Sequence, residues 1–217
     1  MYRVFKRVFD FTSALCLFIV ISPLFLILCI LVRWKLGAPI FFKQARTGLG
    51  GKAFNIRKFR TMTDERDADG NLLPDDKRLV GFGRWLRSTS LDELPELLSI
   101  INGDMAVIGP RPMPPAYTDY YTEYEKSRFK VRGGLVPPES MYFDNYVTWD
   151  KQLKYEADYA NHLSLRLDVK ILISVFKLIF LRTKTDYGEY VRKPLNVERT
   201  NMKKECDEEN FDNCTSC

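Results

Sequence analysis

The chain has a single histidine and only five cysteines among its 217 residues. A metal centre built on several histidines is therefore excluded, and a lone histidine is more often structural than catalytic. Cys16 and Cys29 lie in an apolar run, where a thiol behaves as a small apolar side chain. Three further cysteines lie in an acidic tail and match no familiar metal-ligand spacing, which favours reduced thiols in a cytoplasmic compartment: Cys206, Cys214 and Cys217.

Charged side chains are absent from Phe11 to Val32. This run is long enough to cross a membrane as a helix, which takes about 20 residues. It is too long for the apolar core of a signal peptide, about 7–15 residues, and no small-residue cleavage site follows it. Basic residues flank both ends: Arg3, Lys6 and Arg7 precede it, and Arg33, Lys35, Lys43 and Arg46 follow it. Because lysine and arginine favour the cytoplasmic side, a single crossing would misplace one group.

Ser22 and Pro23 interrupt this apolar run near its middle. A proline inside a helix removes a backbone donor and costs about 3 kcal/mol, so it kinks the helix. A serine hydroxyl can satisfy a carbonyl that the kink frees. Two structures fit these residues: a helix that enters the membrane, bends at Ser22-Pro23 and returns, and a kinked helix that crosses it. The basic residues at both ends favour the re-entrant helix.

Charge is distributed unevenly along the chain. The net charge is +5, but residues 203–217 contain two lysines against five acidic residues, a net of −3, so residues 1–202 carry +8. A basic body is suited to an anionic partner such as lipid headgroups, nucleotide phosphates or nucleic acid. No groove-reading motif accompanies the charge, and the apolar anchor makes a nucleic-acid-binding module the weaker interpretation.

The remaining pattern predicts a mainly helical α+β fold with one small β-hairpin. Short β-like runs at 39–42 and 53–59 flank a glycine-rich loop that lacks Walker spacing. A polar loop is expected at 63–77, where Arg78 stands in place of the closing glutamate of a calcium loop. Helices are predicted at 91–101, 117–129, 150–159 and 165–181, with Asn102-Gly103 ending the first. The last is amphipathic, and it either packs on a core or lies at the membrane interface.

Two adjacent carboxylates, Asp92 and Glu93, open the predicted helix at 91–101. One interpretation is structural: Ser90 and Glu93 have the spacing of a capping box, and acidic residues suit a helix N-terminus. The other is chemical, because many basic residues crowd the same part of the chain and arginine binds phosphate oxygens through two donors. Magnesium uses one or two carboxylates together with substrate phosphates. The residues therefore suggest a Mg²⁺–diphosphate site in which Asp92 is the metal ligand.

Five short motifs occur in order along the chain. They are the Ser22-Pro23 break, Lys58-Phe59-Arg60-Thr61-Met62, Leu91-Asp92-Glu93-Leu94-Pro95, Asn102-Gly103-Asp104-Met105 and Gly109-Pro110-Arg111-Pro112. Each is weak alone, but together, over about residues 2–184, the chain resembles the bacterial sugar transferase family, the monotopic phosphoglycosyl transferases that begin glycan assembly.

The resemblance implies a monotopic membrane protein with a re-entrant membrane helix over 1–35, a catalytic domain over 36–184 and a polar, acidic, cysteine-containing tail over 185–217. It implies that Asp92 is the nucleophile, which takes a sugar phosphate from a UDP-sugar, releases UMP and passes the sugar phosphate to polyprenol (undecaprenyl) phosphate. It also implies that Glu93 assists, either as a base toward the incoming polyprenol phosphate or by holding the pair of acids. The candidate phosphate-binding residues are Lys58, Arg60, Arg87, Arg111 and Arg132.

The resemblance also implies Mg²⁺ as cofactor, membrane lipid as a partner and a place on the cytoplasmic face of the inner membrane, with a homodimer left open. One segment departs from the family pattern: after Arg132 a Pro-Gly-Ile/Leu-Thr-Gly-Trp-Gln type run is usual, and here Gly133 to Ser140 reads GGLVPPES. The departure leaves the nucleotide sugar open. A catalytically inactive membrane adaptor of the same fold is the alternative function.

Overall fold

The computed structural model describes residues 1–142, 148–181 and 193–200. The chain forms two compact units. The first comprises Met1–Arg46 and Ala53–Val107, and the second comprises Thr47–Lys52 and Ile108–Cys217. The sheets are small, with β1 paired to β2 and β3 paired to β4. The predicted α+β fold, mainly helical with a long apolar N-terminal helix, is confirmed.

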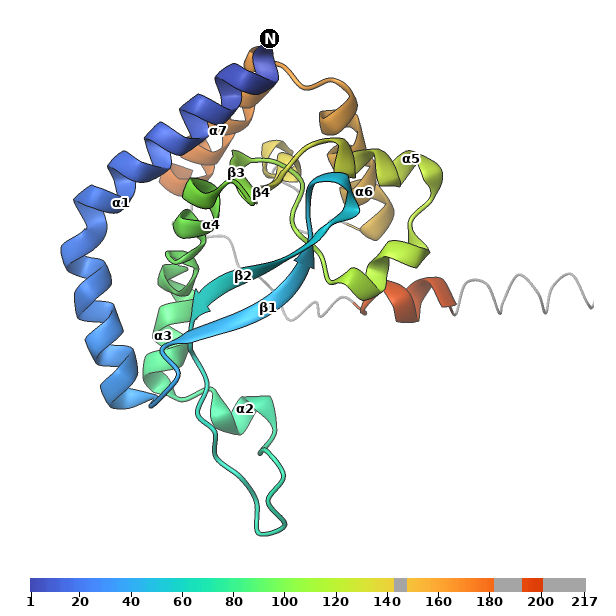
Figure 1. Ribbon diagram of the computed structural model, residues 1–217. Helices are drawn as coiled ribbons and strands as arrows, with labels where there is room; N and C mark the ends of the chain where they lie inside the picture. The colour runs from blue at the N-terminus through green and yellow to red at the C-terminus, as the bar shows by residue number, and fades with distance from the viewer. Residues whose placement is uncertain (143–147, 182–192, 201–217) are drawn as a thin grey trace, which may run out of the picture. The chain divides into compact units, whose positions relative to one another are not determined.

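The first unit begins with α1 (Tyr2–Lys35), a helix of 34 residues with Pro23 inside it. Figure 1 shows that α1 changes direction partway along its length. Proline is a usual cause of such a bend, and the Ser22 hydroxyl donates a hydrogen bond to Ile19 O at 2.8 Å. The chain thus remains helical through the predicted break. Among the described residues, α1 is the one helix long and apolar enough to cross a membrane.

The C-terminal half of α1 packs into the core of the first unit. Phe25, Leu28 and Val32 are buried together with Phe59 and Leu86. Their spacing of three and four residues places them on one face of the helix. The opposite surface stays uncovered, and it presents a row of large apolar side chains that includes Leu17, Ile19, Val20, Leu24, Leu26, Ile27, Ile30 and Trp34.

The N-terminal half of α1 is fastened to the same unit by polar contacts. Arg7 donates to Ile100 O at 2.6 Å and to Ile101 O at 2.9 Å. Both carbonyls belong to the last turn of α4 (Glu96–Asn102), where Ile100 O also accepts from Gly103 N–H at 3.1 Å and Ile101 lies too near the helix end to find a donor within the helix. Asp10, which is buried, accepts a hydrogen bond from Val107 N–H at 3.1 Å and pairs with Lys6 at 3.5 Å. Both halves of α1 are therefore attached to the first unit.

The predicted hairpin is present as β1 (Phe41–Thr47) and β2 (Ala53–Phe59), joined through a 3₁₀ turn at Leu49–Gly51. The polar loop that follows contains the short helix α2 (Asp75–Arg78). Asp67 accepts hydrogen bonds there from the backbone N–H groups of Asp69 and Asn71, at 3.0 and 2.8 Å. Its carboxylate thus shapes a turn, as expected of a solvated loop. Next comes α3 (Gly81–Ser88).

The helix predicted at 91–101 forms in two parts. A 3₁₀ turn covers Leu91–Glu93, and α4 begins after Pro95, which lies where its missing N–H is not needed. Gly103 ends α4 with φ 95°, as the Asn102-Gly103 signal predicted.

The second unit contains β4 (Gly133–Val136), the short helix α5 (Glu123–Lys126) and the longer helices α6 (Trp149–Asn161) and α7 (Leu165–Leu181). The strand β3 (Met105–Ile108) ends at the boundary between the units. Short 3₁₀ helices occupy Pro115–Tyr120, Ser127–Lys130 and Pro138–Met141. Helices α6 and α7 confirm the predictions at 150–159 and 165–181. In α7, Ile171 is buried, whereas Val169, Ile173 and Phe176 are exposed.

The predicted helical stretch over 117–129 is present, and the structure divides it into three short helices. Thr122 is the reason. Its side chain accepts a hydrogen bond from Glu125 N–H, and the Glu125 carboxylate accepts one from Thr122 N–H, which is a complete capping box. A capping residue has extended backbone, so α5 starts anew at Glu123.

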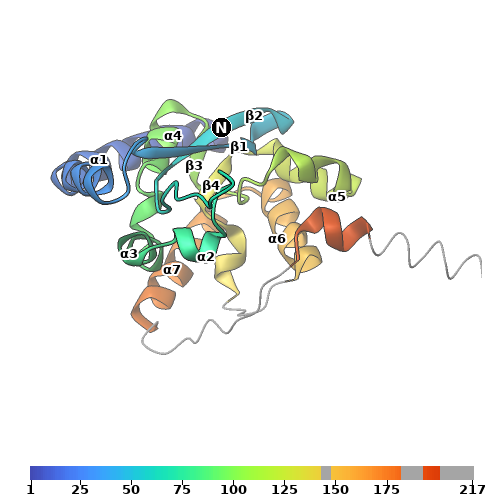
Figure 2. The ribbon, with the colours of Figure 1, turned by 90° about the horizontal axis from the view of Figure 1, so that it is seen from below.

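Residues 195–200 form one further helical segment, which Figure 2 shows beside α6. Leu195 is fully buried with Tyr121, Trp149 and Leu153. Arg199 pairs with Glu125 at 2.6 Å and with Asp150 at 2.9 Å. The acidic, cysteine-containing part of the predicted tail, residues 203–217, lies outside the described residues.

We expect Arg7→Ala to lower the thermal unfolding midpoint of the protein in detergent, because it leaves Ile101 O without its donor, at about 1–3 kcal/mol for an unsatisfied group, and leaves Ile100 O with Gly103 N–H alone. Arg3→Ala, which removes an exposed arginine from the same turn of α1, is the control and should leave the midpoint unchanged. Equal midpoints for the two variants would contradict the fastening of α1 to α4.

Candidate active site

Asp92 and Glu93 lie in the 3₁₀ turn that precedes α4. The capping-box interpretation is wrong, since Ser90 adopts the left-handed conformation with φ 56° and its side chain makes no capping hydrogen bond. Instead Glu93 accepts a hydrogen bond from Lys58 Nζ at 2.5 Å. The pair of acids is therefore held by a cation from β2.

Lys58 contacts a second carboxylate that the sequence did not single out. Its Nζ lies 3.3 Å from Glu96 Oε1, and Glu96 is buried. Glu96 follows Glu93 by three residues, a spacing that places two side chains on the same face of a helix. That spacing was the available signal. Lys58 thus bridges two acids, and with Asp92 they give three carboxylates near one ammonium group.

Asp92 is buried, and burial is the main cause that raises the pKa of its carboxyl group above the ordinary value. Lys58 opposes this shift most strongly and Arg87 adds to the opposition, whereas the charge of Glu93 supports it. The Asp92 carboxylate is therefore poorly solvated but close to cations. A carboxylate in such surroundings can act as a nucleophile toward an electrophilic phosphorus atom.

A cavity of about 260 Å³ lies in the first unit and carries arginines and aromatic rings in its wall. Arg87, from α3, donates from Nε to Thr61 Oγ1 at 3.0 Å. Helix α3 comes this close because a Cβ atom at Gly83 would lie 1.7 Å from Thr61 O. The cavity is lined by Pro39, Phe41, Phe42, Arg60, Thr61, Met62, Asp64, Arg78 and Arg87. Three guanidinium groups at one cavity can bind a diphosphate.

Arg60 holds the wall of this cavity together. Its Nε donates to Met62 O at 2.8 Å, Nη1 donates to Ala38 O, and Nη2 forms an ion pair with Asp64. The side chain is buried, and its contacts join the segment before β1 to the loop after β2. The phosphate-binding role of Arg60 stays a prediction, and it requires a substrate phosphate to share a guanidinium that already has protein partners.

Arg111 and Arg132 belong to the second unit. The backbone of Arg111 is clamped from both sides: its N–H donates to Glu156 Oε1 at 3.0 Å, and its carbonyl accepts from Arg128 Nη2 at 2.6 Å. Arg128 and Glu156 form an ion pair at 2.6 Å with both side chains almost fully buried, and Gln152 donates to Glu156 at 3.1 Å. The Arg111 residue itself is exposed. The turn is rigid while its side chain faces solvent.

The segment that departs from the family pattern has its own packing. A Cβ atom at Gly134 would lie 2.1 Å from Gly109 N, so the backbone of β4 lies directly against the Gly109-Pro110 turn. In the same segment, burial and the charge of Glu156 raise the pKa of Glu139 to about 8, although Arg111 and Arg128 oppose the shift. The shift favours the protonated form of the Glu139 carboxyl group. Sequence reasoning assigned no role to Glu139, Arg128 or Glu156.

The sequence was compared with models of known protein families. Residues 1–182 match the model of the family described as "Bacterial sugar transferase". The chain belongs to this family, and it is a sugar transferase.

Several curated proteins are similar to the chain. An "Uncharacterized sugar transferase EpsL" of Bacillus subtilis (strain 168) is 44% identical over 169 residues, which cover 78% of this chain and 84% of that protein. A "UDP-glucose:undecaprenyl-phosphate glucose-1-phosphate transferase" of Klebsiella pneumoniae is 33% identical over 80% of this chain, but only 40% of its own length is covered. One with the same name from Caulobacter vibrioides is 34% identical over 77% of this chain and 67% of its own length.

Glu156→Ala should destabilise the protein strongly, because it leaves Arg128 as an unpaired buried charge, at a cost of about 3–5 kcal/mol. Glu123→Ala is the matched control: Glu123 is exposed and pairs with the exposed Lys126, so a change below about 1 kcal/mol is expected. Thermal unfolding in detergent compares the two variants. A Glu156→Ala protein as stable as Glu123→Ala would show that the buried ion pair does not support the Arg111 turn.

Proposed function

We propose that this sugar transferase moves a sugar 1-phosphate from a UDP-sugar to polyprenol phosphate, and so begins the assembly of a capsule, an O-antigen, an exopolysaccharide or a glycoprotein glycan. The observation that carries this proposal is the buried Asp92 carboxylate, with Lys58 and Arg87 acting on its charge and a cavity with three arginines in the same unit. The names of the Klebsiella and Caulobacter relatives agree with it.

The reaction proceeds in two displacements. An Asp92 carboxylate oxygen attacks the sugar-linked phosphorus of the donor, the bond from that phosphorus to the bridging oxygen breaks, and UMP leaves with that oxygen. A phosphate oxygen of polyprenol phosphate then attacks the same phosphorus and the bond to Asp92 breaks. The products are polyprenyl diphosphate-sugar and free Asp92. A covalent intermediate replaces one difficult transfer by two easier ones.

Three side chains near Asp92 have separate roles in this reaction. Lys58 orients Glu93 through their 2.5 Å hydrogen bond, and Glu93 accepts the proton from an acceptor phosphate that arrives protonated. Arg87 lines the cavity and is placed to neutralise phosphate charge as it shifts. The phosphate-binding roles of Arg111 and Arg132, in the second unit, rest on the family resemblance alone.

Asp92 fits a magnesium ion that arrives with the donor. The described residues contain no cluster of three or more metal-binding side chains, and magnesium often uses only one or two carboxylates and completes its shell with substrate phosphates and water. The hard oxygen atoms of Asp92, with Glu93 next to it, are suitable donors. The bound ion would supply charge neutralisation at the diphosphate.

The packing of α1 supports a monotopic arrangement on the cytoplasmic face of the inner membrane. Arg7 and Asp10, before Pro23, and Phe25, Leu28 and Val32, after it, all pack on the first unit. If the helix crossed the bilayer, its two halves could not both contact one compact unit on one side. The exposed apolar side chains near the middle of α1 would then dip into the lipid, with both ends cytoplasmic.

Asp92→Asn should abolish the release of UMP from a UDP-sugar, because the amide keeps the shape of the side chain and loses its nucleophilic charge. Purified protein in nanodiscs is tested with magnesium, a panel of UDP-sugars and polyprenol phosphate. Asp76→Asn, on the exposed helix α2, is the control and should retain full activity. Mass spectrometry of wild-type protein with donor alone should find a sugar phosphate on Asp92. Full turnover in Asp92→Asn would refute the mechanism.

Single cysteines at position 3 and at position 35, in a protein whose native cysteines are replaced by serine, report the topology. Both Arg3→Cys and Lys35→Cys are expected to react with a membrane-impermeant thiol reagent only when the cytoplasmic side is accessible. Labelling from opposite sides would establish a helix that crosses the membrane and would overturn the re-entrant arrangement.

A further inference from the structure

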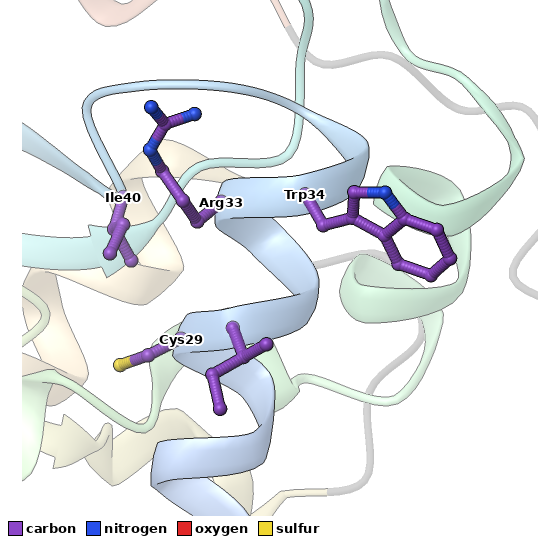
Figure 3. A pocket seen from close by; sticks show the side chains of 5 residues that line it. Cys29, Arg33, Trp34 and Ile40 are labelled. Atoms are coloured by element: carbon purple, nitrogen blue, oxygen red, sulfur yellow. The ribbon is translucent and has the colours of Figure 1, made fainter.

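A second hollow in the first unit lies at the C-terminal end of α1. Its volume is about 510 Å³, and it is lined by Cys29, Ile30, Arg33, Trp34 and Ile40. Figure 3 shows Cys29 and Arg33 on the side of α1 that faces Ile40, while Trp34 points to the other side. We call this hollow the α1 groove. Its wall is apolar apart from a single cation.

Arg33 is an exposed cation without a protein partner. It makes no hydrogen bond or ion pair within the described residues, and Ile30 and Trp34 beside it are 68% and 79% exposed. Tryptophan and arginine at the end of an apolar helix are typical of the level of lipid headgroups. The α1 groove therefore combines apolar walls with the positive charge of Arg33, at the level expected for lipid phosphates.

The residues that line the groove fit a lipid phosphate better than a nucleotide sugar. A nucleotide sugar carries a uracil ring, a ribose and sugar hydroxyls, which need several hydrogen-bond partners. The Arg33 guanidinium is the one strong polar side chain in the lining of the groove. A molecule with a long apolar chain and one phosphate matches this lining, because the chain covers apolar side chains and the phosphate pairs with Arg33.

The α1 groove adjoins the cavity that carries the arginines. Ile40 lines the groove and its neighbour Pro39 lines the cavity. Arg60 supports this short segment, since its backbone N–H donates to Ile40 O at 2.9 Å and its side chain donates to Ala38 O. The α1 groove and the arginine-lined cavity are therefore lined by neighbouring residues of one backbone segment, Ile40 and Pro39. A bulk phospholipid would gain nothing from that proximity, whereas the phosphate of the acceptor must reach the arginines that neutralise charge during transfer.

We propose that the α1 groove is the docking site of the polyprenol phosphate acceptor, with its isoprenoid chain against Cys29, Ile30 and Ile40 and its phosphate drawn to Arg33 before transfer. This inference rests on the proposed function and adds the place where the acceptor docks. Arg33 acts in binding and takes no part in the chemical step.

Arg33→Gln tests the proposal, because it should change KM for one substrate and not for the other. The loss of a charge-assisted contact worth about 1.5–3 kcal/mol should raise KM for polyprenol phosphate roughly tenfold or more. The KM for the UDP-sugar and the amount of UMP released by donor alone should not change. Arg3→Gln, at the other end of α1, removes the same charge from an exposed position and should leave all three values unchanged. An unaltered acceptor KM in Arg33→Gln would overturn the docking site.

The same experiment separates this inference from the proposed function. If wild-type protein released no UMP from any donor, the function would fail regardless of Arg33. If donor-only release were normal in Arg33→Gln and the acceptor KM unchanged, only the docking site would fail.

Cys29 gives a direct second measurement. In a protein whose other four cysteines are serine, Cys29 should react with N-ethylmaleimide in nanodiscs, and polyprenol phosphate should slow this reaction. Arg33→Gln should remove the protection. Equal protection by phosphatidylglycerol at the same concentration would show that the α1 groove accepts any anionic lipid, and it would overturn the assignment to the acceptor.

Discussion

The interaction on which the site depends is the contact of Lys58 with the acids at the start of α4. Glu93 and Glu96 both lie within 3.3 Å of its Nζ atom, and Asp92 is buried nearby. Three carboxylates so close together would repel one another and would lose their water at a high cost in free energy. One ammonium group from β2 makes the arrangement tolerable, so the hairpin and α4 must meet before the site exists. The acids at the start of α4 therefore depend on Lys58, which lies more than thirty positions earlier in the chain.

The apolar helix α1 is attached to the same unit as Lys58 and the acids. Arg7 and Asp10 fasten the N-terminal half of α1 to the end of α4 and to Val107 of β3, and Phe25, Leu28 and Val32 join the core together with Phe59 of β2. Helix α4, which directly follows Asp92 and Glu93, is thus held at its C-terminal end by the apolar helix α1. In a protein whose acceptor is a lipid, such an attachment would fix the depth of the acids relative to the membrane surface.

The parts of the fold that sequence reasoning predicted are those set by local pattern. The apolar run gave α1, alternating residues around a glycine-rich turn gave the hairpin, and periodic apolar residues gave α6 and α7. The errors came where a side chain could bind either a residue close in sequence or one brought near by the fold. Glu93 has the right spacing to cap with Ser90, but it binds Lys58 instead. The contacts of Arg128 with Glu156, 28 positions apart, could not be found from spacing, because no periodicity links distant segments. Asp92, Glu93, Lys58 and Arg87, which sequence reasoning singled out, lie close together, and their roles stay predictions, whereas Glu96 was missed.

Residues 195–200 lie beyond the segment that matches the family model, yet Leu195 is buried among Tyr121, Trp149 and Leu153. Arg199 at the same time joins Glu125 of the α5 capping box to Asp150 of α6. A chain cut at residue 182 to obtain a minimal domain would lose Leu195, and the side chains of Trp149 and Tyr121 would lose the cover that Leu195 gives them. Family boundaries are drawn from shared residues, and here the cohesion of the second unit extends past them.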